Sequence, residues 1–394
     1  MEETPMTLLS QPALERVPAP SADGRLRFFE DDGSAAAVIP TDRRSNHAPS
    51  ILSLPGGGLL AAWFGGSDEG NKDIDILVSR FDVDTGRWTA SAAVNHDEIR
   101  SDQNPGLFAA PDGTIWRVYT SQLSRQSGVP ETFNLQHTSV VKVIRSTDDG
   151  VSWSEPETLF DREGTFCRQP IQVLEDGTWV HTQWLCLDDD SKNGSDRPVV
   201  QISTDQGSIW RQVEFPEAAG RVHPNVVELE PGRLVSLFRS RFADWVYLSR
   251  SDDGGETWSV PEATEVPNNN AGISAFRLPS GMLALVSNEH QVATEPGEVV
   301  WPYERMRIVI AVSNDEGRTW PVRRVIEPGD GFSGDGNLRS NRRQEYPHGI
   351  VDADGLIHVV YAFSSRRAIR HVVFDEAWIS GVEDQVHTDC KLWG

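Results

Sequence analysis

The chain has 394 residues and a formal net charge of −23 at pH 7, with 36 Lys and Arg against 59 Asp and Glu. This excess of negative charge would repel nucleic acids and anionic membranes, so both are excluded as partners. A small anionic substrate remains compatible with the charge if arginines are concentrated at its site. The hydrophobic fraction of 38% supplies a sizeable core, and 33 Gly and 24 Pro favour many chain reversals and an all-β fold.

The cysteines and the N-terminal segment give no sign of secretion. Cys167, Cys186 and Cys390 are odd in number and widely spaced, so they form neither a disulfide framework nor a tetrahedral metal pattern. Residues 1–20 lack a basic segment followed by an apolar run, and no stretch approaches the roughly 18 apolar residues of a membrane span. We expect reduced, structural cysteines and a cytoplasmic protein.

A β-hairpin pattern repeats between about residue 50 and residue 363. Each copy has a turn glycine between two runs rich in β-forming residues. In chain order the copies are SILSLPGGGLLAAWF, GLFAAPDGTIWRVY, IQVLEDGTWVHTQW, VVELEPGRLVSLF, SAFRLPSGMLALVS and IVDADGLIHVVYAF. The intervening runs DIDILVSR, VVKVIRS and RIVIAVS alternate well enough to be third strands. The pattern predicts one four-stranded sheet for each of the six repeats.

A second repeat, with the spacing S-x-D-x-G-x-x-W, starts at Ser146, Ser203, Ser251 and Ser313. A shorter, degenerate copy lies at residues 84–88. At a hairpin turn the Asp carboxylate accepts backbone N–H bonds, Gly takes a positive φ and Trp packs beneath the turn. We interpret these boxes as structural turns that do not contact substrate.

The six hairpins and four boxes resemble the Asp-box (BNR-repeat) propellers of the sialidase, or neuraminidase, superfamily, and the resemblance covers roughly residues 40 to 375. It implies an all-β fold, a six-bladed β-propeller, in which radial repetition leaves only short sheet edges. A β-sandwich, the rival all-β fold, gives no reason for one box per sheet. We expect residues 1–394 to form a single propeller domain. The segment before about Arg43 and the tail after Trp378 are peripheral or close the ring.

In a propeller, the starts of the first strands and the ends of the second strands meet at one mouth of the central channel. Aligning the hairpins on their turn glycines places polar residues at both positions. First-strand starts carry His47, Gln103, Asn104, Arg168, Gln169, His223, Asn268, Asn269, Asn270, Glu345, Tyr346 and His348. Second-strand ends add Asp68, Glu69, Asp73, Gln122, Arg239, Arg241, Asp244, Asn288, Glu289 and residues 364–367. Convergent polar groups at a channel mouth predict a binding or active site.

The resemblance also implies roles for some of these residues. Sialidases as a family bind the substrate carboxylate with three arginines and use a tyrosine nucleophile, a glutamate partner and an aspartate acid/base. The tyrosine position is similar to Tyr346 in EYPHGIVDADG, and the second arginine to Arg239 in LVSLFRSR. The candidates for the third arginine are Arg342 and Arg343, and those for the acid/base, in the loop FGGSDEGNKDIDI, are Asp68, Glu69 and Asp73.

Two positions depart from the family pattern. His47 stands where the family has an arginine, and His223 stands where it has the glutamate partner of the tyrosine. A neutral histidine can take a proton from Tyr346 or from a sugar hydroxyl near pH 7, because its ordinary pKa is about 6.5. Losing one arginine removes a bidentate carboxylate contact. This argues against sialic acid itself and favours another acidic sugar, held by the remaining arginines.

The favoured function is exo-acting hydrolysis of a terminal acidic sugar of an oligosaccharide. The catalytic candidates are Tyr346, His223, His47, Asp68, Glu69 and Glu345. The substrate-binding candidates are Arg168, Arg239, Arg241, Arg342, Arg343, Gln103, Asn104, Asn270 and His348. Two alternatives stay open: an oligosaccharide lyase, in which arginine neutralises a uronate and His and Tyr transfer protons, and a non-catalytic sugar-binding propeller.

Two further points concern chemistry at the same site. If two carboxylates flank the scissile bond, the separation of Glu69 and Glu345 would distinguish retention from inversion. The sequence lacks a phosphate-binding glycine loop, an H-E-x-x-H run and a nucleotide fingerprint, so no cofactor is expected. No metal is required either, although His47, His223 and His348 could converge on one.

Overall fold

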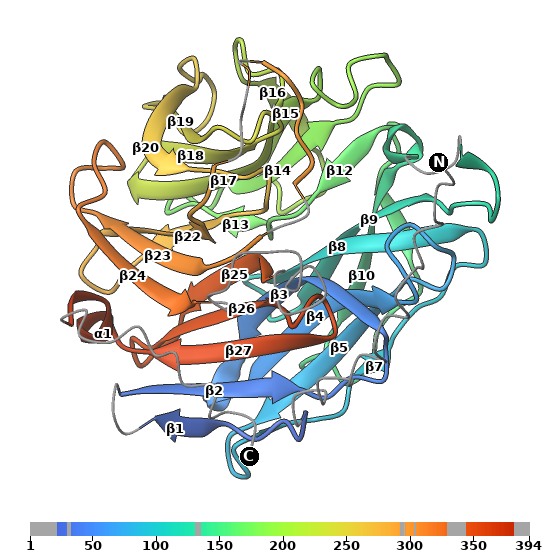
Figure 1. The fold of residues 1–394 in the computed structure, drawn as a ribbon, viewed down its shortest axis with the longest axis vertical. Helices are drawn as coiled ribbons and strands as arrows, with labels where there is room; N and C mark the ends of the chain where they lie inside the picture. Colours follow the sequence, from blue (N-terminus) through green and yellow to red (C-terminus); the bar gives the residue numbers. More distant parts are fainter. Residues whose placement is uncertain are drawn as a thin grey trace, which may run out of the picture.

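The computed structural model describes residues 22–29, 33–130, 135–291, 295, 297–302, 305–328 and 344–381. The described residues form six antiparallel sheets, which are arranged as blades in a ring (Figure 1). Each sequence hairpin forms two neighbouring strands of one sheet. The prediction of an all-β, six-bladed propeller is therefore confirmed.

The first three blades follow one another along the chain. The first consists of β3 (Ser45–Ser53), β4 (Leu59–Gly66), β5 (Asp75–Asp82), β6 (Arg87–Trp88) and β7 (Ala92–Ala93), with η1 (Pro55–Gly57) in its first turn. The second consists of β8 (Arg100–Ala109), β9 (Ile115–Leu123), β10 (Val140–Ser146) and β11 (Glu157–Phe160), with η3 (Gln136–Thr138) before β10. The third consists of β12 (Thr165–Cys167), β13 (Gln172–Val173), β14 (Trp179–Leu185), β15 (Arg197–Ser203) and β16 (Arg211–Glu214).

The remaining blades complete the ring. The fourth consists of β17 (Arg221–Glu230), β18 (Arg233–Ser240), β19 (Trp245–Ser251) and β20 (Glu262–Pro267). The fifth consists of β21 (Ser274–Arg277), β22 (Leu283–Asn288), β23 (Ile308–Ser313) and β24 (Val322–Glu327). The sixth consists of β25 (Glu345–Val351), β26 (Ile357–Phe363), β27 (Ala368–Phe374), β2 (Ser34–Ile39) and β1 (Arg27–Phe29).

The sixth blade joins the two ends of the described chain. Strand β2 pairs antiparallel with β27, so that Ala37 lies opposite His371, and Figure 1 shows β2 and β1 beside β27. The short helix α1 (Glu376–Ser380) follows β27, and Asp375 caps it by accepting a hydrogen bond from the Trp378 N–H at 2.8 Å. The N-terminal strands thus close the ring by hydrogen bonding to the last blade.

The two repeated sequence patterns correspond to two kinds of turn. The glycine between the first two strands has a φ of +74° to +88° in every blade, a conformation that strongly favours glycine. In each box the Ser hydroxyl donates to the Asp carboxylate and accepts the Gly N–H at 2.8–2.9 Å. The same carboxylate accepts the N–H four residues after the Asp at 2.8–2.9 Å. These bonds stabilise the turns between the third and fourth strands of the second to fifth blades. The turns lie at the end of the blade opposite the first-strand starts.

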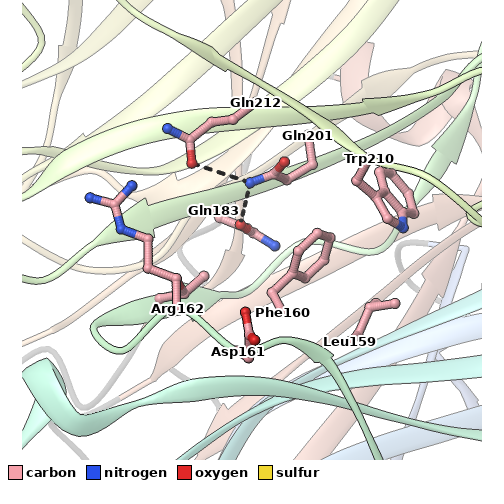
Figure 2. Close-up of a pocket in the computed structure, with 9 residues that line it drawn as sticks. Leu159, Phe160, Asp161, Arg162, Gln183, Gln201, Trp210 and Gln212 are labelled. Carbon is pink, nitrogen blue, oxygen red and sulfur yellow. Dashed lines mark hydrogen bonds between the residues drawn. The ribbon is translucent and has the colours of Figure 1, made fainter.

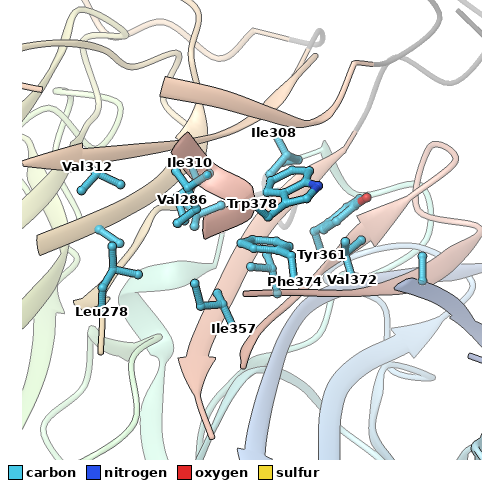
Figure 3. Packing of buried hydrophobic residues seen from close by; sticks show 14 of the residues in the cluster. Leu278, Val286, Ile308, Ile310, Val312, Ile357, Tyr361, Val372, Phe374 and Trp378 are labelled. Atoms are coloured by element: carbon cyan, nitrogen blue, oxygen red, sulfur yellow. The ribbon is translucent and has the colours of Figure 1, made fainter. Parts of the chain in front are cut away.

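Hydrophobic side chains fill the spaces between blades. Figure 3 shows the cluster between the fifth and sixth blades, where Trp378 of α1 covers residues of β23, β26 and β27. Trp378 stacks on Phe374 with ring centroids 4.4 Å apart, and the Arg324 guanidinium lies 3.7 Å from its ring. Truncating such a buried aromatic costs about 3–5 kcal/mol, so α1 is part of the core. Among the described residues, none of the helices has the length and apolar character needed to span a membrane.

Candidate active site

The first strands of four blades carry the same irregularity at their starts. Strands β3, β8, β17 and β25 each contain a β-bulge at the residue before a proline. The bulged residues have φ of +51° to +53°, and they are Ala48, Asn104, His223 and Tyr346. A non-glycine residue at this φ costs of order 1–3 kcal/mol and persists only where surrounding contacts enforce it. The repeated bulge therefore supports a functional role for the side chains at the channel mouth.

Tyr346 lies at the centre of a group of arginines. The guanidinium carbons of Arg168, Arg239 and Arg305 are 5.9, 5.3 and 5.4 Å from the centroid of its ring. All three arginines are at least nine-tenths buried. Gly272 makes room for the ring, because a Cβ there would lie 3.0 Å from it. The structure thus brings Arg168, Arg239 and Tyr346 together and adds Arg305, which the sequence did not predict.

Arg239 has three hydrogen-bond partners in this group. Its Nη1 donates to the phenolic oxygen of Tyr346 and lies 3.1 Å from Nε2 of His223, while its Nε donates to Oδ1 of Asn270 at 2.7 Å. The His223 ring stacks on Trp184 with centroids 4.3 Å apart. His223 has no hydrogen bond to Tyr346 among the described residues, although the two ring centroids are only 5.3 Å apart.

The pKa values of Tyr346 and His223 follow from these contacts. Burial would raise the pKa of the Tyr346 hydroxyl, but the charges of Arg239 and Arg305 outweigh it and lower the pKa below its ordinary value near 10. Burial lowers the pKa of His223 well below 6.5, and the charge of Arg239 lowers it further. At neutral pH His223 is therefore uncharged, and its Nε2 accepts the Arg239 hydrogen bond.

A second layer of charges surrounds Glu345. Arg305 donates to its carboxylate at 2.5 Å, and Arg366 donates to both of its oxygens, at 2.9 and 3.0 Å. Arg366 also donates to Glu69 at 2.6 Å. Burial raises the pKa of Glu69, but the charge of Arg366 outweighs it and lowers the pKa. Glu345 is fully buried and holds two arginines in place, whereas Glu69 reaches the same cluster from the loop after β4.

His47 packs directly on the tyrosine. Its ring centroid lies 4.1 Å from that of Tyr346, and its Nε2 is 3.7 Å from the Glu345 carboxylate. His47 thus takes part in the same cluster as the nucleophile candidate. The side chain is fully buried against Phe64, so its proton exchange would occur inside the site.

The fourth blade adds an arginine that is already neutralised. Arg241 donates to Oδ2 of Asp196 from two nitrogens, at 2.6 and 3.1 Å, and both side chains are fully buried. Trp301 lies over this arginine and over Arg239, with ring centroids 4.8 and 5.7 Å from the two guanidinium carbons. Trp301 is 47% exposed, which makes it an aromatic surface at the rim of the site.

Several arginine N–H groups at the site have no hydrogen-bond partner within the part of the chain that the structure describes. Arg168 Nε and Nη1, Arg239 Nη2 and Arg305 Nε are buried without a hydrogen bond among the described residues. Arg168 and Arg239 also form no ion pair with a described carboxylate; their hydrogen bonds go to backbone carbonyls and to neutral side chains. A buried positive charge that no negative charge balances is costly in free energy. This arrangement therefore favours the binding of an anionic ligand group beside Tyr346.

Other predicted residues lie away from this centre or have local roles. Asp68 is largely exposed and meets Arg125 at 3.4 Å, and Asp73 accepts bonds from Ser67 within its own loop. His348 accepts the Ile51 N–H at 3.2 Å, a contact between the sixth and first blades. Gln103 donates to Ser101 at 3.2 Å, whereas the buried Asn104 makes no side-chain hydrogen bond to a described residue. Arg342 and Arg343 lie outside the described residues.

Within the described ranges, no group of three or more His, Cys, Asp or Glu side chains is placed to hold a metal ion. His47 and His223 both contact Tyr346, but His348 turns to the blade interface. The chemistry that this arrangement offers is that of an activated tyrosine, nearby carboxylates and an anion-binding cluster of arginines.

The sequence of residues 57–359 matches the family model for a BNR repeat-like domain. The chain belongs to this family. A curated relative, a sialidase from Micromonospora viridifaciens, is 26% identical over 366 residues, which cover 85% of this chain and 52% of the relative. The chain thus spans about half the length of that relative. The family match and the relative together make it a BNR propeller of the sialidase superfamily.

Solved structures share the fold of this BNR propeller. A Hadza microbial sialidase superposes with a TM-score of 0.68 at 19% identity, covering 85% of this chain and 66% of that one. A protein of unknown function from Dyadobacter fermentans superposes with a TM-score of 0.66 at 19% identity, covering 88% of this chain and 98% of that one. The intramolecular trans-sialidase of Ruminococcus gnavus, in complex with oseltamivir carboxylate, superposes with a TM-score of 0.66 at 13% identity. The match covers 92% of this chain and 100% of that one.

Sequence reasoning missed two residues of this BNR propeller site, Arg305 and Trp301, and it assigned no role to a third, Arg366. Arg305 and Trp301 come from the segment between β22 and β23, and Arg366 follows β26. Arg366 was among the polar residues at the second-strand ends but received no role. The sequence did contain a signal for Arg305. The segment between β22 and β23 is the longest connection of the fifth blade, and long connections of a propeller often carry site residues.

Proposed function

We propose that this BNR propeller is an exo-acting glycoside hydrolase that releases a terminal acidic sugar, with Tyr346 as the nucleophile. The observation that carries the proposal is the set of buried arginine N–H groups around the Tyr346 ring that no described residue bonds. A sugar carboxylate fits this site because guanidinium groups pair with carboxylates in a planar, bidentate way. The enzyme class is supported by the sialidase relative and by the family match.

In the first step, Tyr346 reacts as the phenolate, and its oxygen attacks the anomeric carbon of the bound sugar. The glycosidic C–O bond breaks, and the leaving oxygen takes a proton from Glu69. This forms a covalent bond between the sugar and the tyrosine oxygen. In the second step, water loses a proton to Glu69 and attacks the same carbon, and the tyrosine oxygen leaves. One water molecule is consumed, and the anomeric configuration is retained.

The tyrosine is activated by its cationic neighbours. The hydrogen bond from Arg239 and the charge of Arg305 stabilise the phenolate, as the lowered pKa of Tyr346 indicates. His223 is a positioning residue in this proposal, because its Nε2 orients Arg239. Glu345 positions Arg305 and Arg366 in the same way, since its two oxygens are both occupied by these arginines. The pair Glu69 and Glu345 then does not flank the scissile bond.

Glu69 supports the acid/base role better than Asp68 or Asp73. Its carboxylate lies close enough to Tyr346 to influence the tyrosine pKa, and it binds Arg366 through only one oxygen among the described contacts. Asp68 faces Arg125 and is largely exposed. A carboxylate that is partly exposed and adjacent to the nucleophile can reach the leaving oxygen of a bound glycoside.

The proposal is tested by product analysis with the wild-type chain and the Tyr346→Phe variant. Both are incubated with glucuronides, galacturonides and sialosides, and the products are identified by mass spectrometry and NMR. We expect the wild type to release a saturated acidic monosaccharide, initially with retained configuration, and the variant to release none. Absence of turnover on the whole panel with intact binding would favour the non-catalytic propeller instead.

Elimination is a second candidate, and the contact between His47 and Tyr346 favours it. The ring of His47 lies against Tyr346, which gives the site two groups able to move protons beside an arginine cluster. In a lyase one group would remove the proton next to a neutralised uronate carboxylate, and the other would protonate the leaving oxygen. The same product analysis separates the two reactions, because the lyase product is lighter by one water molecule and absorbs in the near ultraviolet.

A further inference from the structure

A polar cavity lies between the second and third blades and shares no lining residue with the Tyr346 site. Its volume is about 260 Å³. The residues that line it are Leu159, Phe160, Asp161, Arg162, Thr165, Gln183, Gln201, Trp210 and Gln212. Figure 2 shows Arg162 and the three glutamines on one side of this cavity and Phe160, Leu159 and Trp210 on the other.

Three glutamines form a row across one face of the third blade. Gln183, Gln201 and Gln212 come from the neighbouring strands β14, β15 and β16. The Gln201 amide donates to Gln183 at 3.1 Å and to Gln212 at 3.4 Å, as the dashed lines in Figure 2 mark. This arrangement leaves the Gln201 carbonyl oxygen and the Gln212 amide nitrogen without a partner among the described residues. The row thus offers an acceptor and a donor to the cavity.

The rest of the lining adds further polar groups and an aromatic surface. The hydroxyl of Thr165 is buried without a hydrogen bond in the described part of the chain. Asp161 and Arg162 have no side-chain hydrogen bond or ion pair to a described residue. The rings of Phe160 and Trp210 meet at an angle of 64°, with centroids 5.6 Å apart. A buried hydroxyl without a partner is rare in folded proteins, and here it faces the same cavity as the exposed Asp161 and Arg162 and the open ends of the glutamine row, which indicates a ligand.

Folding alone does not require this polar lining. The opposite face of the third blade packs against the fourth blade through Val180, Val200, Ile202 and Phe215, all apolar and buried. On the lined face, in contrast, Gln183 is fully buried and Gln201 is nearly so. Burying amides costs free energy unless their hydrogen bonds are replaced. An apolar interface would serve packing equally well, so the glutamine row points to recognition.

We infer that this cavity binds one neutral pyranose unit, such as a hexose or an N-acetylhexosamine. The single positive charge of Arg162 is balanced by Asp161, which disfavours a charged ligand. Amide, hydroxyl and carboxylate groups match the mixed donors and acceptors of sugar hydroxyls, and Phe160 offers an apolar surface for the C–H face of the ring. The volume lies just below the roughly 300–1,000 Å³ of pockets for drug-sized ligands, yet far above the ~30 Å³ of one water.

The inference goes beyond the proposed hydrolysis, because a neutral sugar would bind here without being cleaved. It is tested with the full chain by saturation-transfer NMR and titration of the methyl glycosides of glucose, galactose, mannose and N-acetylglucosamine, with glycerol as a negative control. Variants at the cavity are Gln212→Leu and Thr165→Val. The matched control is Glu214→Gln, an exposed residue of the same strand β16 that does not line the cavity.

At least one glycoside is expected to bind, and Gln212→Leu is expected to weaken that binding about tenfold or more, since an unreplaced hydrogen bond to a buried partner is lost. Glu214→Gln and Tyr346→Phe should bind like the wild type. If Tyr346→Phe weakens binding and Gln212→Leu does not, the sugar occupies the Tyr346 site and the inference is overturned. It is also overturned if none of the four glycosides binds. Melting curves of each variant exclude unfolding, and Thr165→Val gives a second test if Gln212→Leu is unstable.

Discussion

Arg239 and Tyr346 form one unit at the centre of the propeller. The guanidinium donates a hydrogen bond to the phenolic oxygen, and neither side chain is more than 8% exposed. The arginine reaches this position from the end of β18, and the tyrosine from the bulged start of β25, so two non-adjacent blades build the contact. The charge of the arginine helps to lower the tyrosine pKa, which supports the proposed role of Tyr346 as the nucleophile.

Arg239→Lys is expected to reduce kcat/KM about 10²- to 10³-fold. Lysine keeps the positive charge but loses the planar geometry with which arginine holds Tyr346, His223 and Asn270 together. Because the stabilising contact to the phenolate weakens, the pKa of Tyr346 rises, and the limb of the pH profile that reports the phenolate moves to higher pH. The profile of kcat/KM against pH measures both effects.

Arg211→Lys is the control for this change, because Arg211 is half exposed and pairs with Glu256 on the surface. Its activity and pH profile should equal those of the wild type. An Arg239→Lys variant with reduced activity but an unshifted pH limb would show that Arg239 only binds substrate and does not tune the tyrosine.

Glu69→Gln is expected to slow cleavage of natural glycosides about 10²- to 10⁴-fold, the usual contribution of a general acid/base. Aryl glycosides with good leaving groups should be cleaved in the first step at a nearly normal rate, because they need little protonation. The proposed mechanism requires the proton of Glu69. The charge of Arg366 outweighs burial and lowers the pKa of this residue, so the wild-type activity is expected to fall as pH rises above the acidic range. Asp68→Asn should leave the rates on natural glycosides, the rates on aryl glycosides and the pH dependence unchanged. If Asp68→Asn has the larger effect, the acid/base assignment is reversed.

The fold could be read from the sequence because its signals are local. A turn glycine at positive φ, or a box in which Asp binds the N–H four residues later, depends on a few neighbouring residues. The alignment of the hairpins also located His47, His223 and Tyr346, since corresponding strand starts reach the same channel mouth. Repetition thus converted local patterns into relative positions in space.

What the sequence could not predict depends on contacts between blades. Glu345 is a carboxylate beside Tyr346 in the sequence, but only the structure shows that Arg305 and Arg366 occupy both of its oxygens. Arg305 is distant in sequence from the aligned strand starts, and its position is set by a long connection. The polar cavity with Gln201 was also missed, because which blade face a strand residue meets is decided by the packing of neighbouring sheets.

A buried chain of hydrogen bonds connects the first and sixth blades. The Trp88 indole donates to Nδ1 of His371 at 3.1 Å, Nε2 of His371 meets Nδ1 of His358 at 3.0 Å, and Nε2 of His358 meets Asp352 at 2.9 Å. The indole can only donate, so each histidine accepts at Nδ1 and donates from Nε2. Both imidazoles are neutral in this chain, and protonation of either would break a bond that it accepts.

Acid is therefore expected to destabilise the fold well above the pH at which carboxylates titrate. Burial lowers the pKa values of His358 and His371, and it lowers those of His181 and His348 to about 3. Each histidine is protonated more readily in the unfolded chain, near pH 6.5, so its stabilisation is complete above that pH and is lost as pH falls toward the folded-state pKa. At pH 5.5 His181 and His348 each lower the free energy of unfolding by on the order of 1 kcal/mol, because their folded-state pKa values lie far below that pH.

Urea unfolding at pH 7.5 and pH 5.5 measures this loss. The His371→Gln variant should be less stable at pH 7.5 and lose on the order of 1 kcal/mol less than the wild type between the two pH values, because the pKa of His371 lies well below its ordinary value. His96 provides the control, because it is exposed and its pKa is raised chiefly by its hydrogen bond to Asp75. Because its pKa is raised in the folded chain, His96 stabilises the fold more as pH falls. His96→Asn should therefore not reduce the acid sensitivity of the fold. Equal stability of the wild type at both pH values would contradict the prediction.

Trp301→Ala is expected to raise KM for oligosaccharide substrates about tenfold while leaving kcat within about twofold. The indole lies over Arg239 and Arg241 at the rim of the site and is 47% exposed, so it offers a stacking surface to the part of the substrate that leaves. An aryl glycoside that lacks further sugar units should show a smaller change. Because half of the ring is already in water, the melting temperature should change little. A variant with normal KM and reduced kcat would instead place Trp301 in the positioning of Arg239, since the two side chains are in contact.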